Sequence, residues 1–234
     1  GHTESIYDAS FSNDGTRIAT AGYDQIAKIW NLNGKLLTEL KGHSALIGTV
    51  LFITGDTLII TASDDLSIKL WDNNGKELKT MKGHTATIWS TCFSPDGKQI
   101  LTASDDASAR LWDLNGTEFM LLKGHSGQIL NANFSPDGKN VVTASGDGTA
   151  RIWNIQPHEN PVLKGHTAYV YDANFSPDGK YIVTAGWDYT ARYWSKMGYL
   201  QQILRGHTKY TLHNGTFSEN GKLIVTKSGD RTIR

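Results

Sequence analysis

The chain has 234 residues, with 23 basic and 23 acidic side chains, so its formal net charge is zero. That length accommodates one large all-β domain or two smaller ones, and 38% hydrophobic with 20% charged residues is typical of a globular protein, not a disordered one. The neutral balance gives no electrostatic basis for binding nucleic acid or an anionic membrane, so we expect neither as a partner.

The longest apolar runs, among them Val50–Ile53 and Phe119–Leu122, are too short to cross a bilayer. The single cysteine, Cys92, excludes an internal disulfide framework and a cysteine-based zinc site. The six histidines of the Gly-His pairs are 41 residues apart, a spacing unlike that of metal ligands. We therefore expect a cytoplasmic protein without a metal or other cofactor.

Gly-His pairs, single tryptophans and single phenylalanines all recur along the chain with a period of 41 residues. A period of 20–50 residues indicates a repeat architecture, and this one divides the chain at each Gly-His pair. The predicted repeats are 1–41, 42–82, 83–123, 124–164, 165–205 and a truncated 206–234.

The third repeat shows the expected elements in chain order. A strand from Ile88 to Phe93 leads into a hairpin at Ser94-Pro95-Asp96-Gly97, where proline suits a type I turn and glycine the left-handed position after it. A second strand from Gln99 to Ala103, a tight turn and a third strand from Ser108 to Asp113 follow. Asn115-Gly116 predicts a type I′ turn into a fourth strand through Leu122, and Asn33-Gly34 and Asn74-Gly75 predict the same turn in earlier repeats.

Four antiparallel strands in roughly 40 residues, with Gly-His near one end and Trp-Asp near the other, resemble the WD-repeat family. The resemblance covers the whole chain, and Phe-Ser-Pro-Asp-Gly-Lys at Phe93, Phe134 and Phe175 is similar to bacterial members. It implies an all-β fold: one β-propeller domain over 1–234, with five complete four-stranded blades and an incomplete sixth. Since propellers of this family most often have seven blades, we expect part of a seven-bladed ring, whose unclosed blades would expose sheet edges suited to self-association.

A histidine, a threonine, an aspartate and a tryptophan keep a fixed spacing in every complete repeat. The sets are His2, Thr20, Asp24 and Trp30; His43, Thr61, Asp65 and Trp71; His84, Thr102, Asp106 and Trp112; His125, Thr143, Asp147 and Trp153; and His166, Thr184, Asp188 and Trp194, with His207, Thr226 and Asp230 in the sixth repeat. Up-and-down strands bring His and Asp to the same end of a blade, where they can bond. A Thr–His–Asp set could act as nucleophile, base and orienter, but six copies favour the buried structural network that the resemblance implies.

Residues that differ between repeats are the better candidates for function, because the fold already explains those that agree. Trp89 and Trp187 are the two tryptophans outside the motif. The resemblance implies that partners contact the third and fifth residues after the histidine and the residue before the aspartate. The candidate binding residues at or beside these positions are Tyr7, Tyr23, Asp64, Trp89, Asp105, Tyr169, Tyr171, Trp187 and Tyr189.

These side chains have two interpretations. The rings could plug the central channel or pack between blades, or they could form a binding face of rigid aromatic anchors. The second interpretation, together with the resemblance, predicts a non-catalytic scaffold or sensor that binds a protein or peptide. Aromatic faces beside Asp64 and Asp105 would suit a basic side chain of that partner. The alternative is a propeller enzyme acting on a small substrate in the central channel.

Overall fold

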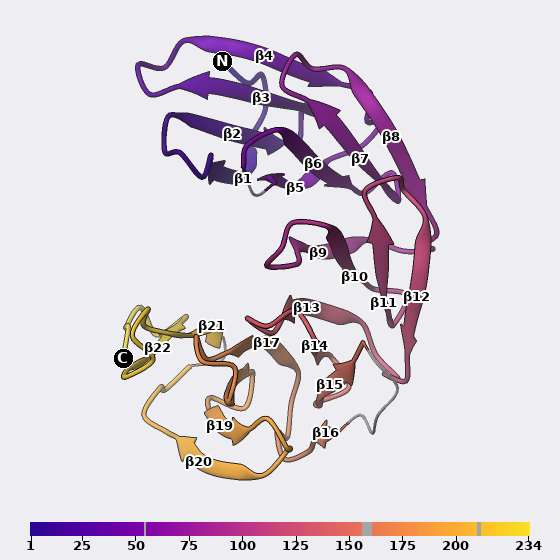
Figure 1. The fold of residues 1–234 in the computed structure, drawn as a ribbon. Coiled ribbons are helices and arrows are strands. Elements are labelled where there is room, and N and C mark those ends of the chain that lie inside the picture. The colour runs from indigo at the N-terminus through magenta and orange to yellow at the C-terminus, as the bar shows by residue number, and fades with distance from the viewer. Residues whose placement is uncertain (54, 156–160, 210–211) are drawn as a thin grey trace.

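The computed structural model describes residues 1–53, 55–155, 161–209 and 212–234. These residues form five four-stranded antiparallel sheets and one two-stranded sheet, as expected for an all-β propeller (Figure 1). The sheets comprise, in chain order, β1 (Ile6–Phe11), β2 (Arg17–Gly22), β3 (Ile26–Asn31) and β4 (Leu36–Lys41); β5 (Ile47–Phe52), β6 (Leu58–Ser63), β7 (Ser67–Asp72) and β8 (Glu77–Lys82); β9 (Ile88–Phe93), β10 (Gln99–Ser104), β11 (Ser108–Asp113) and β12 (Glu118–Lys123); β13 (Ile129–Phe134), β14 (Asn140–Ser145), β15 (Ala150–Asn154) and β16 (Val162–Leu163); β17 (Val170–Phe175), β18 (Tyr181–Gly186), β19 (Ala191–Ser195) and β20 (Leu200–Leu204); and β21 (Leu212–Phe217) with β22 (Ile224–Ser228). We call the sheets blades 1 to 6.

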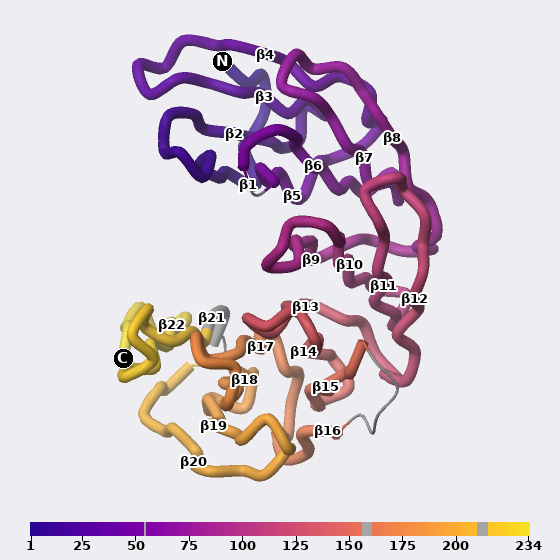
Figure 2. The backbone as a smooth tube through the Cα atoms, in the orientation of Figure 1, coloured from indigo at the N-terminus to yellow at the C-terminus, as the bar shows by residue number. Residues whose placement is uncertain are grey.

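The blades follow one another around an arc, and the backbone trace shows the same order (Figure 2). The first strand of each blade lies on the inner side of the arc, and in the first five blades the fourth strand lies on the outer side (Figure 1). No helix in the described part of the chain is long and apolar enough to cross a membrane.

The turns between strands follow the local sequence, with one correction. In the Ser94–Gly97 turn the Gly97 N–H donates to the Ser94 carbonyl at 2.8 Å, and Gly97 has a φ of 70°, as expected. The predicted type I′ turns at Asn-Gly are wrong: φ is positive at Gly34, Gly75 and Gly116 but at none of the preceding asparagines. A type I′ turn needs two left-handed residues, whereas here four residues lie between the strands and only the glycine is left-handed.

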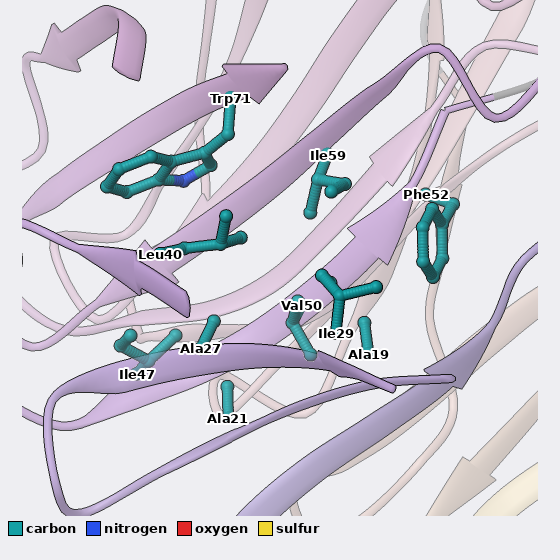
Figure 3. Packing of buried hydrophobic residues seen from close by; sticks show 10 residues of the cluster. All are labelled: Ala19, Ala21, Ala27, Ile29, Leu40, Ile47, Val50, Phe52, Ile59 and Trp71. Atoms are coloured by element: carbon teal, nitrogen blue, oxygen red, sulfur yellow. The ribbon is translucent and has the colours of Figure 1, made fainter. Parts of the chain in front are cut away.

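The hydrophobic core is divided into clusters that lie between neighbouring blades. In the first cluster Leu40 from blade 1 packs with Ile47, Val50 and Trp71 from blade 2 (Figure 3). Further clusters join blades 2 and 3, 3 and 4, 4 and 5, and 5 and 6. Each blade therefore buries its apolar faces against its neighbours, which is why repeat proteins are stabilised by stacking.

Polar side chains connect the innermost strands of most neighbouring blades. In β1, Asp8 accepts a hydrogen bond from the Val50 N–H of β5 at 2.9 Å, and Ser10 donates to the Val50 carbonyl at 2.8 Å. Asp172 in β17 likewise accepts from the Gly215 N–H of β21 at 3.0 Å. Between the fully described strands β5 and β9 no such bond forms: Leu51 stands where blade 1 has Ser10, and the buried Thr91 hydroxyl of β9 lacks a partner.

Candidate functional site

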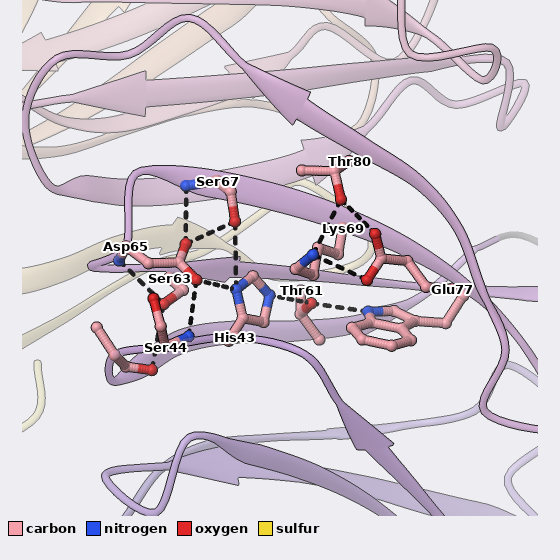
Figure 4. A network of polar contacts seen from close by, with 11 residues as sticks. His43, Ser44, Thr61, Ser63, Asp65, Ser67, Lys69, Glu77 and Thr80 are labelled. Atoms are coloured by element: carbon pink, nitrogen blue, oxygen red, sulfur yellow. Dashed lines mark hydrogen bonds and ion pairs between the residues drawn. The ribbon is translucent and has the colours of Figure 1, made fainter.

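Blade 2 shows how the recurring set of four residues is connected (Figure 4). The Trp71 indole N–H donates to the Thr61 hydroxyl at 2.8 Å, and that hydroxyl lies 2.7 Å from Nε2 of His43. Because an indole N–H can only donate, the hydroxyl accepts from Trp71 and donates its own proton to Nε2. Nδ1 then carries the ring proton and donates to Asp65 across 2.8 Å.

The charges of this network are fixed by its surroundings. Burial lowers the pKa of His43 below its ordinary 6.5, so the ring is neutral at neutral pH. Burial would raise the pKa of Asp65, but hydrogen bonds from Ser67, Ser44 and His43 outweigh it and hold the value at about 2. Asp65 is therefore a carboxylate with several donors, which ties the loop before β5 to the turn between β6 and β7.

The glycine before each motif histidine fits the same arrangement. Gly42 has a φ of 156°, a conformation open to glycine but rarely to other residues. A Cβ at this position would lie 3.2 Å from the Trp71 ring and 3.1 Å from the Glu77 carboxylate. The Gly-His pair thus recurs because the backbone passes directly against the motif tryptophan.

The other blades repeat this network. Even in the sixth, where one residue is inserted, His207 lies 2.9 Å from Asp230 and 3.0 Å from Thr226. The Thr–His–Asp connection has the order of a nucleophile, a base and an orienting group. However, Thr61, Thr102 and Thr184 are completely buried, so no substrate can reach their hydroxyls. The set therefore holds each blade together, as expected from its repetition.

The candidate binding residues lie at the end of the blades that carries the loop before each innermost strand and the turn between each second and third strand. We call this end the upper face. Within a blade, the residue before the motif aspartate donates its N–H to the carbonyl of the third residue after the histidine, for example Trp187 to Tyr169 at 2.9 Å and Asp105 to Thr87 at 2.9 Å. These backbone bonds place side chains from the two loops next to each other.

Aromatic side chains gather on the upper face of blades 1 and 5. Tyr169 and Trp187 stack with their ring centres 5.3 Å apart, and Trp187 is 39% exposed. Tyr7 and Tyr23 meet edge to face with 6.4 Å between ring centres. Tyr189 is exposed and has a φ of 65°, so the turn after Trp187 is held in a left-handed conformation.

Tyr7 connects these aromatic residues with the acidic ones. Burial raises the pKa of the Tyr7 hydroxyl, and Tyr171, Tyr23 and Asp64 raise it further. Tyr171 of blade 5 and Asp64 of blade 2 therefore both contribute to the electrostatic potential at Tyr7. The structure brings the candidates Tyr7, Tyr23, Asp64 and Trp89 of blades 1 to 3 to one region of the upper face.

A hollow of about 260 Å³ opens beside Tyr7. Its lining residues come from blades 1, 2 and 3: Tyr7, Tyr23, Leu46, Gly48, Asp64, Thr87, Ile88 and Trp89. The Trp89 indole N–H donates to the Asp105 carboxylate at 2.6 Å at the edge of this hollow. We call the hollow and Asp105 together the blade 1–3 pocket.

Four lining residues of the blade 1–3 pocket were not predicted as site residues: Leu46, Gly48, Thr87 and Ile88. Leu46 and Thr87 occupy the third position after their histidines and Gly48 the fifth, so their positions were available in the sequence. Their small or aliphatic side chains gave no chemical reason to choose them. Only the arrangement of the blades shows that they surround a hollow.

The described residues contain no group of three or more His, Cys, Asp or Glu side chains arranged to hold a metal ion. A larger polar hollow of about 700 Å³ lies beside Gly42, Lys69, Lys82 and Gly116. Its Lys69 ammonium already contacts Glu77 at 2.8 Å. The blade 1–3 pocket, which combines aromatic rings and carboxylates, is therefore the more distinctive site.

Four-stranded blades around an arc, each held by a His–Asp–Thr–Trp network, define a WD-repeat β-propeller protein. Residues 1–234, the whole chain, match the family described as the first β-propeller of IFT122, and the chain belongs to this family.

Among curated proteins the chain is similar to the mRNA export factor of Bos taurus, with 36% identity over 52 residues. It is similar to those of Sus scrofa and Rattus norvegicus with 35% identity over the same length. The matched segment covers 22% of this chain and 14% of each relative, so the chain spans a small part of these proteins. A match of that length is little more than one repeat and supports the repeat type.

Proposed function

We propose that the chain is a non-catalytic scaffold that binds a protein or peptide on its upper face, with a basic side chain of the partner beside Asp64 and Asp105. The observation that carries this proposal is the set of exposed aromatic side chains there, including Trp187 at 39% exposure in the turn after β18 and Trp89 at 41% exposure near the start of β9. Aromatic residues of this kind are enriched at interface hot spots because they bury much area and lose little conformational entropy.

Two further observations support a scaffold over an enzyme acting in the channel. The recurring spacing of Thr, His and Asp within the chain is explained by networks whose threonine hydroxyls, as in Thr61 and Thr102, are buried out of reach of a substrate. The blade 1–3 pocket, at about 260 Å³, is smaller than the roughly 300–1,000 Å³ typical of small-molecule sites. Since the size of the pocket suits one side chain of a larger partner, we propose a macromolecular ligand. We also propose that the protein is cytoplasmic, because its single cysteine cannot form an internal disulfide of the kind common in secreted proteins.

Trp187→Ala tests the binding face. Peptides selected from a displayed library on the folded chain would be titrated against the wild type and the variant. We expect Trp187→Ala to weaken binding by about 2 kcal/mol, roughly 30-fold, as for a hot-spot residue, while the free energy of unfolding changes by less than about 1 kcal/mol.

Tyr199→Ala is the matched control, since Tyr199 is an exposed aromatic residue in the turn between β19 and β20, away from the upper face. It should leave both quantities unchanged. A large loss of stability in Trp187→Ala with unaltered affinity would show that Trp187 is a packing residue, and the proposed face would lose its main anchor.

A further inference from the structure

Gly48 creates the hollow of the blade 1–3 pocket. It is the fifth residue after its motif histidine, and the same position carries Tyr7, Trp89, Leu130 and Tyr171 in the other complete blades. Gly48 has no left-handed φ, and a Cβ built on it would meet no atom within 4 Å. Neither the backbone nor crowding therefore requires glycine here, and its effect is to leave an open space between Tyr7 and Trp89.

The walls of this space combine two features that attract a cation. Tyr7, Tyr23 and Trp89 present aromatic rings, whose faces are electrically negative. Asp64 lines the same hollow, and Asp105 lies beside Asp64. Among the described residues no Lys or Arg forms an ion pair with Asp64 or with Asp105. Burial raises the pKa of Asp64, and the neighbouring negative charge of Asp105 raises it further.

One carboxylate is better placed for a ligand than the other. Asp105 already accepts the Trp89 indole N–H at 2.6 Å, a contact that also fixes the orientation of the indole ring. Asp64 is exposed and lines the hollow, and its backbone N–H donates to the Leu46 carbonyl at 2.9 Å, but no donor from the described residues reaches its carboxylate. A ligand that brings its own donors would satisfy Asp64 and stack on the rings.

We propose that the space above Gly48 takes the guanidinium group of one arginine of the partner, with Asp64 as its counter-ion and the rings of Tyr7 and Trp89 as its walls. This inference rests on the proposed function and names the side chain that the upper face recognises. Arginine fits better than lysine because a planar guanidinium can donate two parallel hydrogen bonds to one carboxylate while stacking on aromatic faces.

The probe is the peptide acetyl-Gly-Ser-Arg-Gly-Ser-amide, titrated against chain labelled with 15N at its tryptophan indoles. Matched peptides carry lysine or citrulline in place of arginine, and the Trp89 signal is assigned with Trp89→Phe. We expect the arginine peptide to shift the Trp89 indole signal saturably, the lysine peptide to bind at least several-fold more weakly, and the uncharged citrulline peptide to produce no shift. Equal binding of arginine and citrulline, or of arginine and lysine, would overturn the assignment.

Gly48→Leu tests the space itself, because leucine already occupies this position in blade 4 as Leu130. Filling the space should weaken the arginine peptide by at least tenfold with an unchanged melting temperature, and Asp64→Asn should do the same by removing the counter-ion. Asp96→Asn, an exposed carboxylate in the Ser94–Gly97 turn at the other end of blade 3, is the control.

The two proposals fail in different ways. If Gly48→Leu binds the arginine peptide as tightly as the wild type does, the assignment of the pocket is wrong. The proposed binding face would still stand in that case, provided that Trp187→Ala weakens binding of the selected peptides. If the selected peptides bind Trp187→Ala as tightly as the wild type, the proposed binding face is wrong, whatever the titration with the arginine peptide shows.

Discussion

Replacing Thr61 by valine would remove the central hydroxyl of the blade 2 network at nearly constant volume. Thr61 is completely buried, and its hydroxyl accepts the Trp71 indole N–H at 2.8 Å and donates to Nε2 of His43 at 2.7 Å. Valine leaves a buried donor and a buried acceptor without partners, each costing about 1–3 kcal/mol. We therefore expect the free energy of unfolding to fall by about 2–6 kcal/mol, since little packing changes.

Denaturant unfolding followed by tryptophan fluorescence would measure this loss. Thermal melting should show it as well, at roughly 2–4 °C for each kcal/mol in a chain of this size. Thr61→Ser keeps the hydroxyl and should retain most of the stability. Thr57→Val makes the same chemical change at an exposed position and should stay within about 0.5 kcal/mol of the wild type. If Thr61→Val were as stable as Thr57→Val, the inferred direction and value of these hydrogen bonds would be refuted.

Three other predictions concern stability. Trp112→Ala should cost about 3–5 kcal/mol in denaturant unfolding, because the indole is 2% exposed and its loss leaves a cavity; a cost under about 1 kcal/mol would contradict the packing. Asp172 is 6% exposed, and burial raises its pKa from 3.8 to about 6. Its protonated form therefore contributes stability that is fully present below pH 3.8 and is lost as the pH rises through about 6. Asp172→Asn should therefore be more stable than the wild type at pH 7 by about 1–3 kcal/mol, with the gain disappearing near pH 4. In the Asp172→Asn variant, the free energy of unfolding should decline as the pH falls below 6.5. The pKa values of His43, His84 and His125 are lowered in the folded chain, so these histidines become protonated in the unfolded chain at a higher pH than in the folded chain. A free energy of unfolding that stays constant from pH 7 to pH 5 would contradict the buried neutral rings.

The repeat period and the order of strands were determined by the sequence alone. Strand propensity, the Ser-Pro-Asp-Gly turn and the recurrence of His and Trp are local or periodic signals, so the elements of blade 3 were predicted to within a residue at each end. The turn type at Asn115-Gly116 was not, because Asn-Gly suits both a two-residue and a longer hairpin loop, and strand pairing selects between them.

Residues such as Trp187 and Trp89 could be chosen from the sequence because they depart from the consensus of their own repeats. Their neighbours could not, since the stacking of Trp187 on Tyr169 and the bond from Trp89 to Asp105 depend on the spacing of two loops. Gly48 is the clearest case. In the sequence it is a small residue at a variable position, and only the packing of three blades turns its missing side chain into a pocket, because a cavity is a property of the atoms around it.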